Sequence, residues 1–193
     1  KQYQRQGFDF LKEIRGTFVM VIIDHETIHL IRDGAGRRTL FYAKQGNLFT
    51  FAIEQKALSQ INRFERKLKQ SSIVKYFSFS FIPERDTMLE DIFELKPNTI
   101  ISYHPVKGIS EQKFLNLDAL EKHHENDIDY WKEALRKEMK NDVNFLLKNT
   151  DKVGVFLSGG LDSSIISAIV TQESNKTIPT FLSLIHISEP TRL

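Results

Sequence analysis

One stretch of the chain constrains its fold more than any other: two apolar runs separated by a glycine-bearing turn. Val153–Leu157 reads VGVFL, Ser158–Asp162 reads SGGLD, and Ser163–Val170 is again apolar. Ile178–Ser183 supplies a further short apolar run. A strand, a loop, a helix and a second strand in this order predict a βαβ unit, whose two strands are parallel. The last third of the chain is therefore expected to start an α/β domain with a parallel sheet.

The segment before this unit has a helical period. Apolar residues recur every fourth position, and they are Trp131, Leu135, Met139, Val143 and Leu147. This stripe predicts a long amphipathic helix. Residues 184–193 (LIHISEPTRL) fit neither the helix nor the βαβ unit, and the string looks like translated adapter sequence. We therefore expect either that the parallel domain continues beyond this chain or that 184–193 is a non-native tail.

The first part of the chain has the alternation of strands and turns that is typical of antiparallel sheets. Three pairs of apolar runs flank short polar turns: Gly16–Ile23 with Thr27–Arg32, Leu40–Ala43 with Leu48–Ala52, and Thr99–Tyr103 with Gly108–Phe114. The first run lacks polar alternation, so we expect it to be covered on both faces. Helices are expected at Glu54–Ile61 and at Ser71–Phe79, the second of which is expected to begin at a serine cap. Together these elements predict an α+β sandwich of two sheets with helices outside.

The two fold classes place a domain boundary on the chain. Residues 116–128 are polar and poor in apolar side chains, which is typical of a linker. We therefore expect one domain at 1–115 and the beginning of another at 129–193. The chain starts with Lys1 rather than Met, so the native N-terminus is expected to be missing.

Composition excludes several classes of function. The 27 basic and 25 acidic residues nearly balance, giving a net charge of +2, and no basic run indicates nucleic-acid binding. No apolar run reaches the ~18 residues that a membrane helix needs. Cysteine is absent, which excludes a disulfide framework and fits a cytoplasmic protein.

Polar residues in the predicted hairpins are expected to have structural roles. Arg32 and Asp33 are interpreted as an ion pair that fixes a turn, and such exposed pairs contribute only ~0–1 kcal/mol. His25 and His29 alternate along the first hairpin and are expected at the surface.

The loop between the predicted strand and helix has the chemistry of an anion site. The first turn of a helix offers unpaired N–H groups and the positive end of the helix dipole. Gly159 and Gly160 allow the backbone to approach a phosphate closely. Ser158, Ser163 and Ser164 add hydroxyl donors.

Asp162 would repel a bare phosphate, so its place in the loop indicates a Mg²⁺ ligand that bridges to phosphate oxygens. The loop lacks the lysine of a Walker P-loop. The alternative interpretation is an ordinary strand-to-helix turn with a serine or aspartate cap.

The motifs resemble those of one family. Ser158–Ser164 (SGGLDSS) resembles the PP-loop of ATP pyrophosphatases, and Val153–Ile169 is similar to glutamine-hydrolysing asparagine synthetases in particular. Upstream, Arg32–Tyr42 resembles that family's RDxxGxxPLYY stretch, and Phe51–Leu58 resembles FASExKAL. Phe81–Pro97 resembles the segment before the family's linker.

Three positions depart from the family's pattern. Thr39 replaces the usual Pro, Ile53 replaces the usual Ser, and Asn98 stands where Gly is common. The family's amidotransferase nucleophile is a cysteine, which this chain lacks, so no catalytic residue is assigned.

The resemblance implies the rear of a class II glutamine amidotransferase domain, an Ntn-hydrolase-like αββα sandwich, followed by the front of a PP-loop synthetase domain. In that family, ammonia from glutamine displaces AMP from an aspartate side chain that ATP has adenylated. The implied small molecules are glutamine, aspartate and ATP, with Mg²⁺ as cofactor. A homodimer of the full-length protein is a further expectation, and the fragment itself is expected to be inactive.

The family's site residues transfer only to the loop. Leu157 and Ser158 match the start of the nucleotide loop, and Asp162 matches a Mg²⁺ ligand. The pyrophosphate cradle is matched by Gly159, Gly160, Ser163 and Ser164. A β-lactam synthetase or a peptide-cyclising amide synthetase would share this loop, and a non-catalytic nucleotide-binding fragment is a third possibility.

Overall fold

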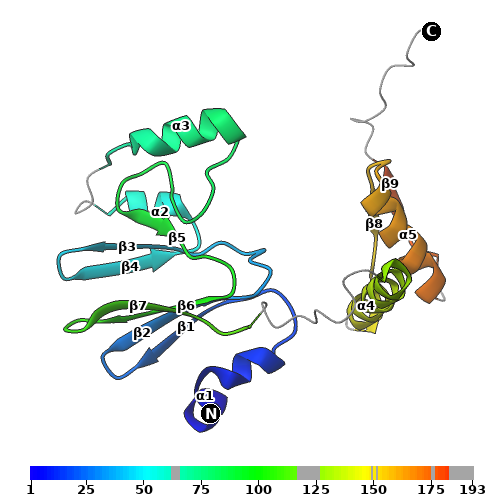
Figure 1. Cartoon of the computed structure of the whole chain (residues 1–193), viewed down its shortest axis with the longest axis horizontal. Coiled ribbons are helices and arrows are strands. Elements are labelled where there is room, and N and C mark those ends of the chain that lie inside the picture. The colour runs from blue at the N-terminus through cyan, green and yellow to red at the C-terminus, as the bar shows by residue number, and fades with distance from the viewer. Residues whose placement is uncertain (62–65, 117–126, 149, 151, 175–176, 183–193) are drawn as a thin grey trace. The chain divides into compact units, whose positions relative to one another are not determined.

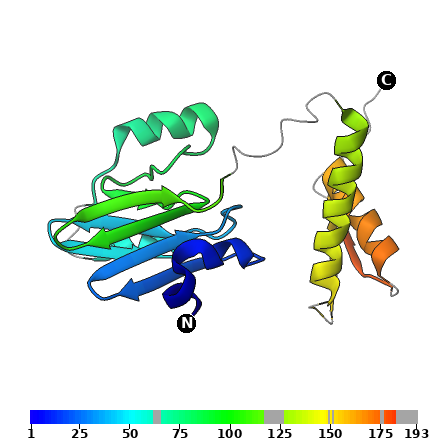
Figure 2. The same ribbon diagram turned by 60° about the horizontal axis from the view of Figure 1, so that its bottom comes forward.

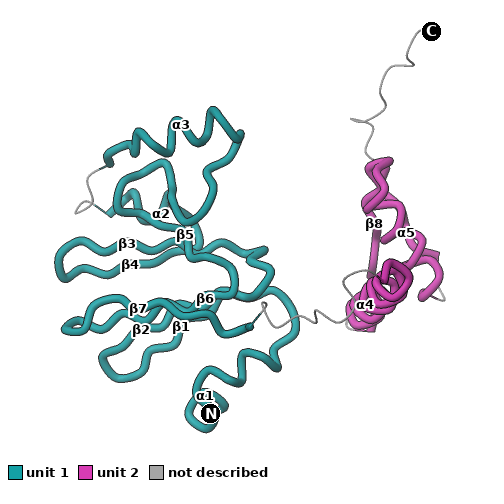
Figure 3. The backbone as a smooth tube through the Cα atoms, in the orientation of Figure 1, with its two compact units in different colours: residues 1–120 teal, residues 121–193 magenta. Residues whose placement is uncertain are grey.

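The computed structural model describes the chain except for residues 62–65, 117–126, 149, 151, 175–176 and 183–193. The chain divides into two compact units, residues 1–120 and 121–193 (Figure 3). Most of the predicted linker, 116–128, and all of the predicted non-native tail, 184–193, lie outside the described residues, so both remain predictions.

The first unit contains two antiparallel sheets (Figure 1). One has the order β1-β2-β6-β7, with strands β1 (Val19–Asp24), β2 (Thr27–Arg32), β6 (Thr99–His104) and β7 (Gly108–Lys113). The other has the order β4-β3-β5, with β3 (Phe41–Gln45), β4 (Leu48–Ala52) and β5 (Ile92–Glu94). The pairings β1–β2, β3–β4 and β6–β7 confirm the three predicted hairpins.

Side chains from both sheets form the central core of this unit, which is Leu30, Leu40, Tyr42, Leu95 and Ile101. The outer face of the first sheet is covered by a short helix, α1 (Gln2–Gln6), and a 3-10 helix, η1 (Gly7–Glu13), through Phe10 and Leu11. The outer face of the second sheet is covered by α2 (Gln55–Ser59) through Leu58. The helix α3 (Gln70–Phe79) lies on that same side (Figure 1).

These four layers confirm the predicted α+β sandwich of antiparallel sheets, as Figure 2 shows from a second direction. One detail was wrong: β1 is not covered along both faces, because Val21 and Ile23, which share a face, are 38% and 71% exposed. The predicted serine cap of α3 was also wrong. Its N-cap is Lys69, which makes no side-chain capping bond.

Arg32 and Asp33 do not form the predicted ion pair. Arg32 is buried and donates to a carboxylate oxygen of Glu94 at 2.7 Å and to the carbonyl of Leu95, so it ties β2 to the second sheet. Asp33 instead accepts backbone N–H groups, one from Phe18 at 3.1 Å and others from the turn that follows. The sequence neighbours separate because successive side chains of an extended chain point to opposite faces.

His25 lies at the surface as predicted, but His29 is buried, with 8% of its area exposed. The hydroxyl of Tyr3 donates to Asp24 at 3.0 Å, and Nε2 of His29 lies 3.2 Å from the same hydroxyl oxygen. Because that tyrosine proton is already used, Nε2 of His29 carries a proton and Nδ1 accepts from Ser102 at 2.7 Å. Tyr3 belongs to α1, so this cluster fastens α1 to the sheet.

The second unit consists of α4 (Ile128–Lys148), β8 (Val155–Leu157), α5 (Leu161–Glu173) and β9 (Thr180–Leu182). β8 pairs with β9 in parallel, as the strand–loop–helix–strand order predicts. A small apolar core joins the helices to β8, and its buried members are Val143, Val155, Ile169 and Val170. Among the described residues, no helix combines the length and apolarity needed to cross a bilayer.

The buried cluster around His29 predicts a pH dependence of stability. Burial lowers the pKa of His29 from its ordinary value of 6.5, against a smaller opposing influence of Asp24. Near pH 6.5 the imidazole of His29 therefore binds a proton more readily in the unfolded chain than in the folded chain. The free energy of unfolding should be highest above this pH and should fall as the pH falls below it.

Urea unfolding of the wild type and of His29→Gln, followed by far-ultraviolet circular dichroism between about pH 5 and about pH 8, tests this prediction. The variant should lose this part of the pH dependence, because glutamine does not titrate in this range. Parallel pH profiles for the two proteins would contradict it.

Candidate functional site

The loop between β8 and α5 brings the predicted site residues to one end of the small parallel sheet. Gly159 has φ 78°, a left-handed conformation that L-residues adopt at a cost. Gly160 is the N-cap of α5 in an extended conformation and, as a glycine, provides no side-chain cap. The alternative of a turn capped by serine or aspartate is therefore not supported at this position.

The first turn of α5 leaves backbone donors available. The first helical bond is donated by the N–H of Ser164 to the carbonyl of Gly160 at 3.2 Å. The N–H groups of residues 161–163 have no acceptor among the described residues. Unpaired donors at the positive end of a 13-residue helix are suited to an anion.

The three serines bond to the loop itself. The Ser163 hydroxyl accepts the N–H of Ser158 at 3.1 Å, lies 3.0 Å from the Ser158 hydroxyl, and donates to the carbonyl of Gly160 at 3.1 Å. The exposed hydroxyl of Ser164 donates to the same carbonyl at 2.8 Å. The hydroxyls predicted as phosphate donors thus have partners inside the loop.

Asp162 fits a magnesium ligand that shares the ion with a substrate. Its side chain is exposed on the first turn of α5, and its carboxylate has no hydrogen bond or ion pair among the described residues. Throughout the residues that the structure describes, no three His, Cys, Asp or Glu side chains are placed so that they could together hold a metal ion. Mg²⁺ commonly binds through one or two carboxylates plus substrate phosphates, so a lone Asp162 is compatible with it.

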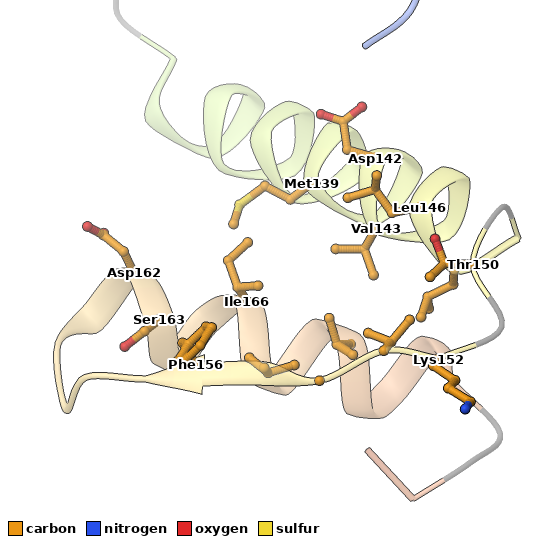
Figure 4. Close-up of a pocket in the computed structure, with 15 residues that line it drawn as sticks. Met139, Asp142, Val143, Leu146, Thr150, Lys152, Phe156, Asp162, Ser163 and Ile166 are labelled. Carbon is orange, nitrogen blue, oxygen red and sulfur yellow. The ribbon is translucent and has the colours of Figure 1, made fainter. Parts of the chain in front are cut away.

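A groove of about 690 Å³ lies next to the loop (Figure 4). Its walls come from α4, β8 and α5 and are mainly apolar, including Met139, Val143 and Ile166. Asp162 and Ser163 lie at one end of it. Phe156, which no sequence motif singled out, also lines the groove and is 80% exposed. The alternation of Val155 with Phe156 along the strand is the signal that could have placed it there.

Comparison with known families identifies both units. The family model described as "Glutamine amidotransferase domain" matches residues 1–115. The chain belongs to the glutamine amidotransferase domain family. A second family model, described as "Asparagine synthase", matches residues 134–189, which include the β8–α5 loop. The resemblance predicted from the sequence motifs is therefore confirmed.

Curated relatives match most of the chain. Glutamine-hydrolysing asparagine synthetase 1 of Bacillus subtilis is 26% identical over 93% of this chain and 28% of its own length. Glutamine-hydrolysing asparagine synthetase B of Escherichia coli is 30% identical over 91% of this chain and 27% of its own length. The chain thus spans less than a third of the length of these two relatives.

Among solved structures, the chain is similar to glutamine phosphoribosylpyrophosphate amidotransferase from B. subtilis. The TM-score is 0.37 at 15% identity, over 93% of this chain and 35% of that one. A similarity this low adds nothing to the fold described above.

Two of the departures from the family's pattern have a structural explanation. Asn98 has φ 56°, and Asn tolerates this left-handed region better than most residues. Its side chain also bonds the backbone of Leu115 in both directions, at 2.8 and 2.9 Å. The Thr39 hydroxyl donates to the carbonyl of Ile53 at 3.0 Å, so the two remaining departures contact each other.

The two loop glycines should respond differently to alanine. Gly159→Ala places a side chain at φ 78° and should destabilise the second unit by ~1 kcal/mol. Gly160→Ala is the matched control, because its extended backbone accepts a side chain and its Cβ would lie 3.4 Å from the Ser158 hydroxyl, an ordinary contact. The control should lose less stability than Gly159→Ala, because it meets only the N-cap preference for glycine over alanine and no left-handed strain.

Urea unfolding of both variants can be followed by the fluorescence of Trp131, which lies in α4 and is the only tryptophan of the sequence. An equal loss of stability in both variants would count against the strained geometry of Gly159.

Proposed function

We propose that this chain is part of a glutamine-dependent asparagine synthetase. The observation that carries this proposal is the start of α5. Its first turn has N–H groups without helical acceptors and also carries the unpaired carboxylate of Asp162. The loop lies in a unit that matches asparagine synthase and follows a unit that matches glutamine amidotransferases. The proposed overall reaction forms asparagine from aspartate, ATP and glutamine.

The loop would serve the ATP-dependent half of this reaction. A carboxylate is a poor acyl donor until its oxygen is converted into a good leaving group, and adenylation with release of pyrophosphate achieves this. The N–H groups of residues 161–163 and the dipole of α5 would bind the negative charge of the phosphates. Mg²⁺ held by Asp162 would neutralise charge on the same phosphates.

The proposed site residues are those that the sequence indicated. Leu157 ends β8 and leads into the loop. The loop and the first turn of α5 supply Ser158, Gly159, Gly160, Asp162, Ser163 and Ser164. The geometry favours backbone donors over hydroxyl donors as the main phosphate contacts, because the hydroxyls already bond within the loop.

The glutamine-dependent half has no assigned catalytic residue in this chain, because the chain contains no cysteine. We propose that the chain alone forms no asparagine, although it binds nucleotide. A related amide synthetase of the β-lactam or peptide-cyclising type would share the loop. Analysis of the products that the full-length protein forms from aspartate, ATP and glutamine separates these alternatives.

Asp162→Asn tests the proposed function directly. In the full-length protein, the loss of one magnesium ligand should reduce ATP–pyrophosphate exchange by at least about 100-fold, while glutaminase activity is retained. The matched control is Asp142→Asn, because Asp142 lines the same groove from α4 and is not part of the loop. This control should leave the exchange rate within about twofold of wild type.

The same pair of variants can be studied in this chain by calorimetric titration with ATP in the presence of Mg²⁺. Only Asp162→Asn should weaken binding. Unchanged exchange and unchanged affinity in Asp162→Asn would exclude the magnesium role.

A further inference from the structure

We propose that the outer side of α3 is a self-association surface, through which the chain binds a second copy of itself. This α3 surface consists of five apolar residues on the helix or directly after it, which are Val74, Tyr76, Phe77, Phe79 and Phe81. It lies in the first unit and includes no residue of the β8–α5 loop. The inference is therefore independent of the proposed function.

The helix α3 turns one side toward the rest of the first unit and leaves the other side open. Ser72 is fully buried, and Lys75, on the same side of the helix, pairs with Asp86. Because successive residues of a helix advance by about 100°, Val74 and Phe77 lie on the side opposite to Ser72. Both are exposed, and Figure 1 shows α3 as the outermost helix on its side of the second sheet. No described residue covers this side of α3.

The aromatic side chains of the α3 surface form two contacting pairs. The ring centroids of Tyr76 and Phe77 are 5.9 Å apart, and those of Phe79 and Phe81 are 6.3 Å apart. Ser80 has φ 62°, a left-handed conformation that ends α3 and turns the chain, so that Phe81 comes to lie against Phe79. Four rings thus gather at the C-terminal end of one helix. Aromatic residues are enriched in the buried centres of protein–protein interfaces.

The charges around the α3 surface favour an uncharged partner. Between Gln70 and Pro83 the only charged residue is Lys75. Its Nζ lies 2.9 Å from the carboxylate of Asp86, which also binds Nζ of Lys69 at 2.7 Å. Nucleic acids and anionic membranes are bound by cations that are available to them, whereas these two lysines are already neutralised. An uncharged surface can meet its own copy without like-charge repulsion.

The area of the α3 surface is sufficient for a symmetric dimer. In a two-fold contact the same surface of both copies meets. The four aromatic residues are between 45% and 81% exposed, and they leave about 500 Å² uncovered because each has roughly 200 Å² to bury. Two copies together would bury about 1,000 Å², which reaches the size expected of a specific interface. Phe77 is the most exposed of the four and is the expected anchor of the contact.

Phe77→Asp tests this surface. A carboxylate in the apolar contact, repeated by the two-fold axis, should raise the dissociation constant of the dimer at least about 100-fold. The matched control is Val106→Asp, because Val106 is as exposed as Phe77 but lies in the turn between β6 and β7. This control should leave the dissociation constant within about twofold of wild type. Phe77→Leu keeps an apolar side chain and should weaken the dimer less than Phe77→Asp.

Sedimentation velocity at protein concentrations from about 1 to about 100 μM measures the dissociation constant, in this chain and in the full-length protein. We expect wild type and Val106→Asp to be dimers at the upper end of this range and Phe77→Asp to be a monomer. Far-ultraviolet circular dichroism verifies that each variant is folded. Folding should be retained, because Phe77 is exposed and its replacement creates no cavity.

A wild-type protein that stays monomeric over this range would overturn the proposal. Equal association of Phe77→Asp and Val106→Asp would do the same, because the contact would then lie elsewhere. If this chain forms dimers through Phe77 but the full-length protein is a monomer, the remaining polypeptide covers the α3 surface and self-association is refuted. Phe77-dependent binding of a monomeric protein to phosphatidylserine vesicles would assign the surface to a membrane instead.

Discussion

The packing of α5 against β8 is the interaction on which the candidate site depends. Val155 on the strand and Ile169 and Val170 on the helix bury their side chains together. This contact fixes the start of α5 beside the end of β8, so that the intervening loop must turn sharply through Gly159. An apolar contact two to three turns along α5 therefore places the unpaired N–H groups of its first turn at this end of the small sheet.

The first unit is organised by a different constraint, the need to cover both faces of two antiparallel sheets. The central core joins the sheets, and helices cover the outer faces. Arg32 links the two sheets by donating hydrogen bonds to Glu94 and to backbone carbonyls. Asp33 accepts hydrogen bonds from the backbone N–H groups of the following turn. The RD pair that the family shares thus has a structural explanation in this chain, in which each residue satisfies buried backbone groups.

Local patterns were enough to predict most elements. The three hairpins follow from apolar runs and turn residues, α4 from its four-residue stripe, and the parallel β8–β9 pair from the strand–loop–helix–strand order. The error at His29 concerns partners that are distant in sequence. His29 was expected at the surface, but Tyr3, Phe8 and Ser102 surround it, and none of them is a neighbour in sequence. Periodicity states which side chains share a face, but it does not state what covers that face.

The sequence by itself determined the family, the order of the elements and the chemical character of the loop, because these depend on residue types at short spacing. Only the tertiary structure decided how the loop's serines are used. A hydroxyl has a fixed number of hydrogen bonds, and their partners depend on the path of the backbone. That path places Ser163 between Ser158 and Gly160 and leaves Ser164 at the surface, although the two serines are adjacent in the motif.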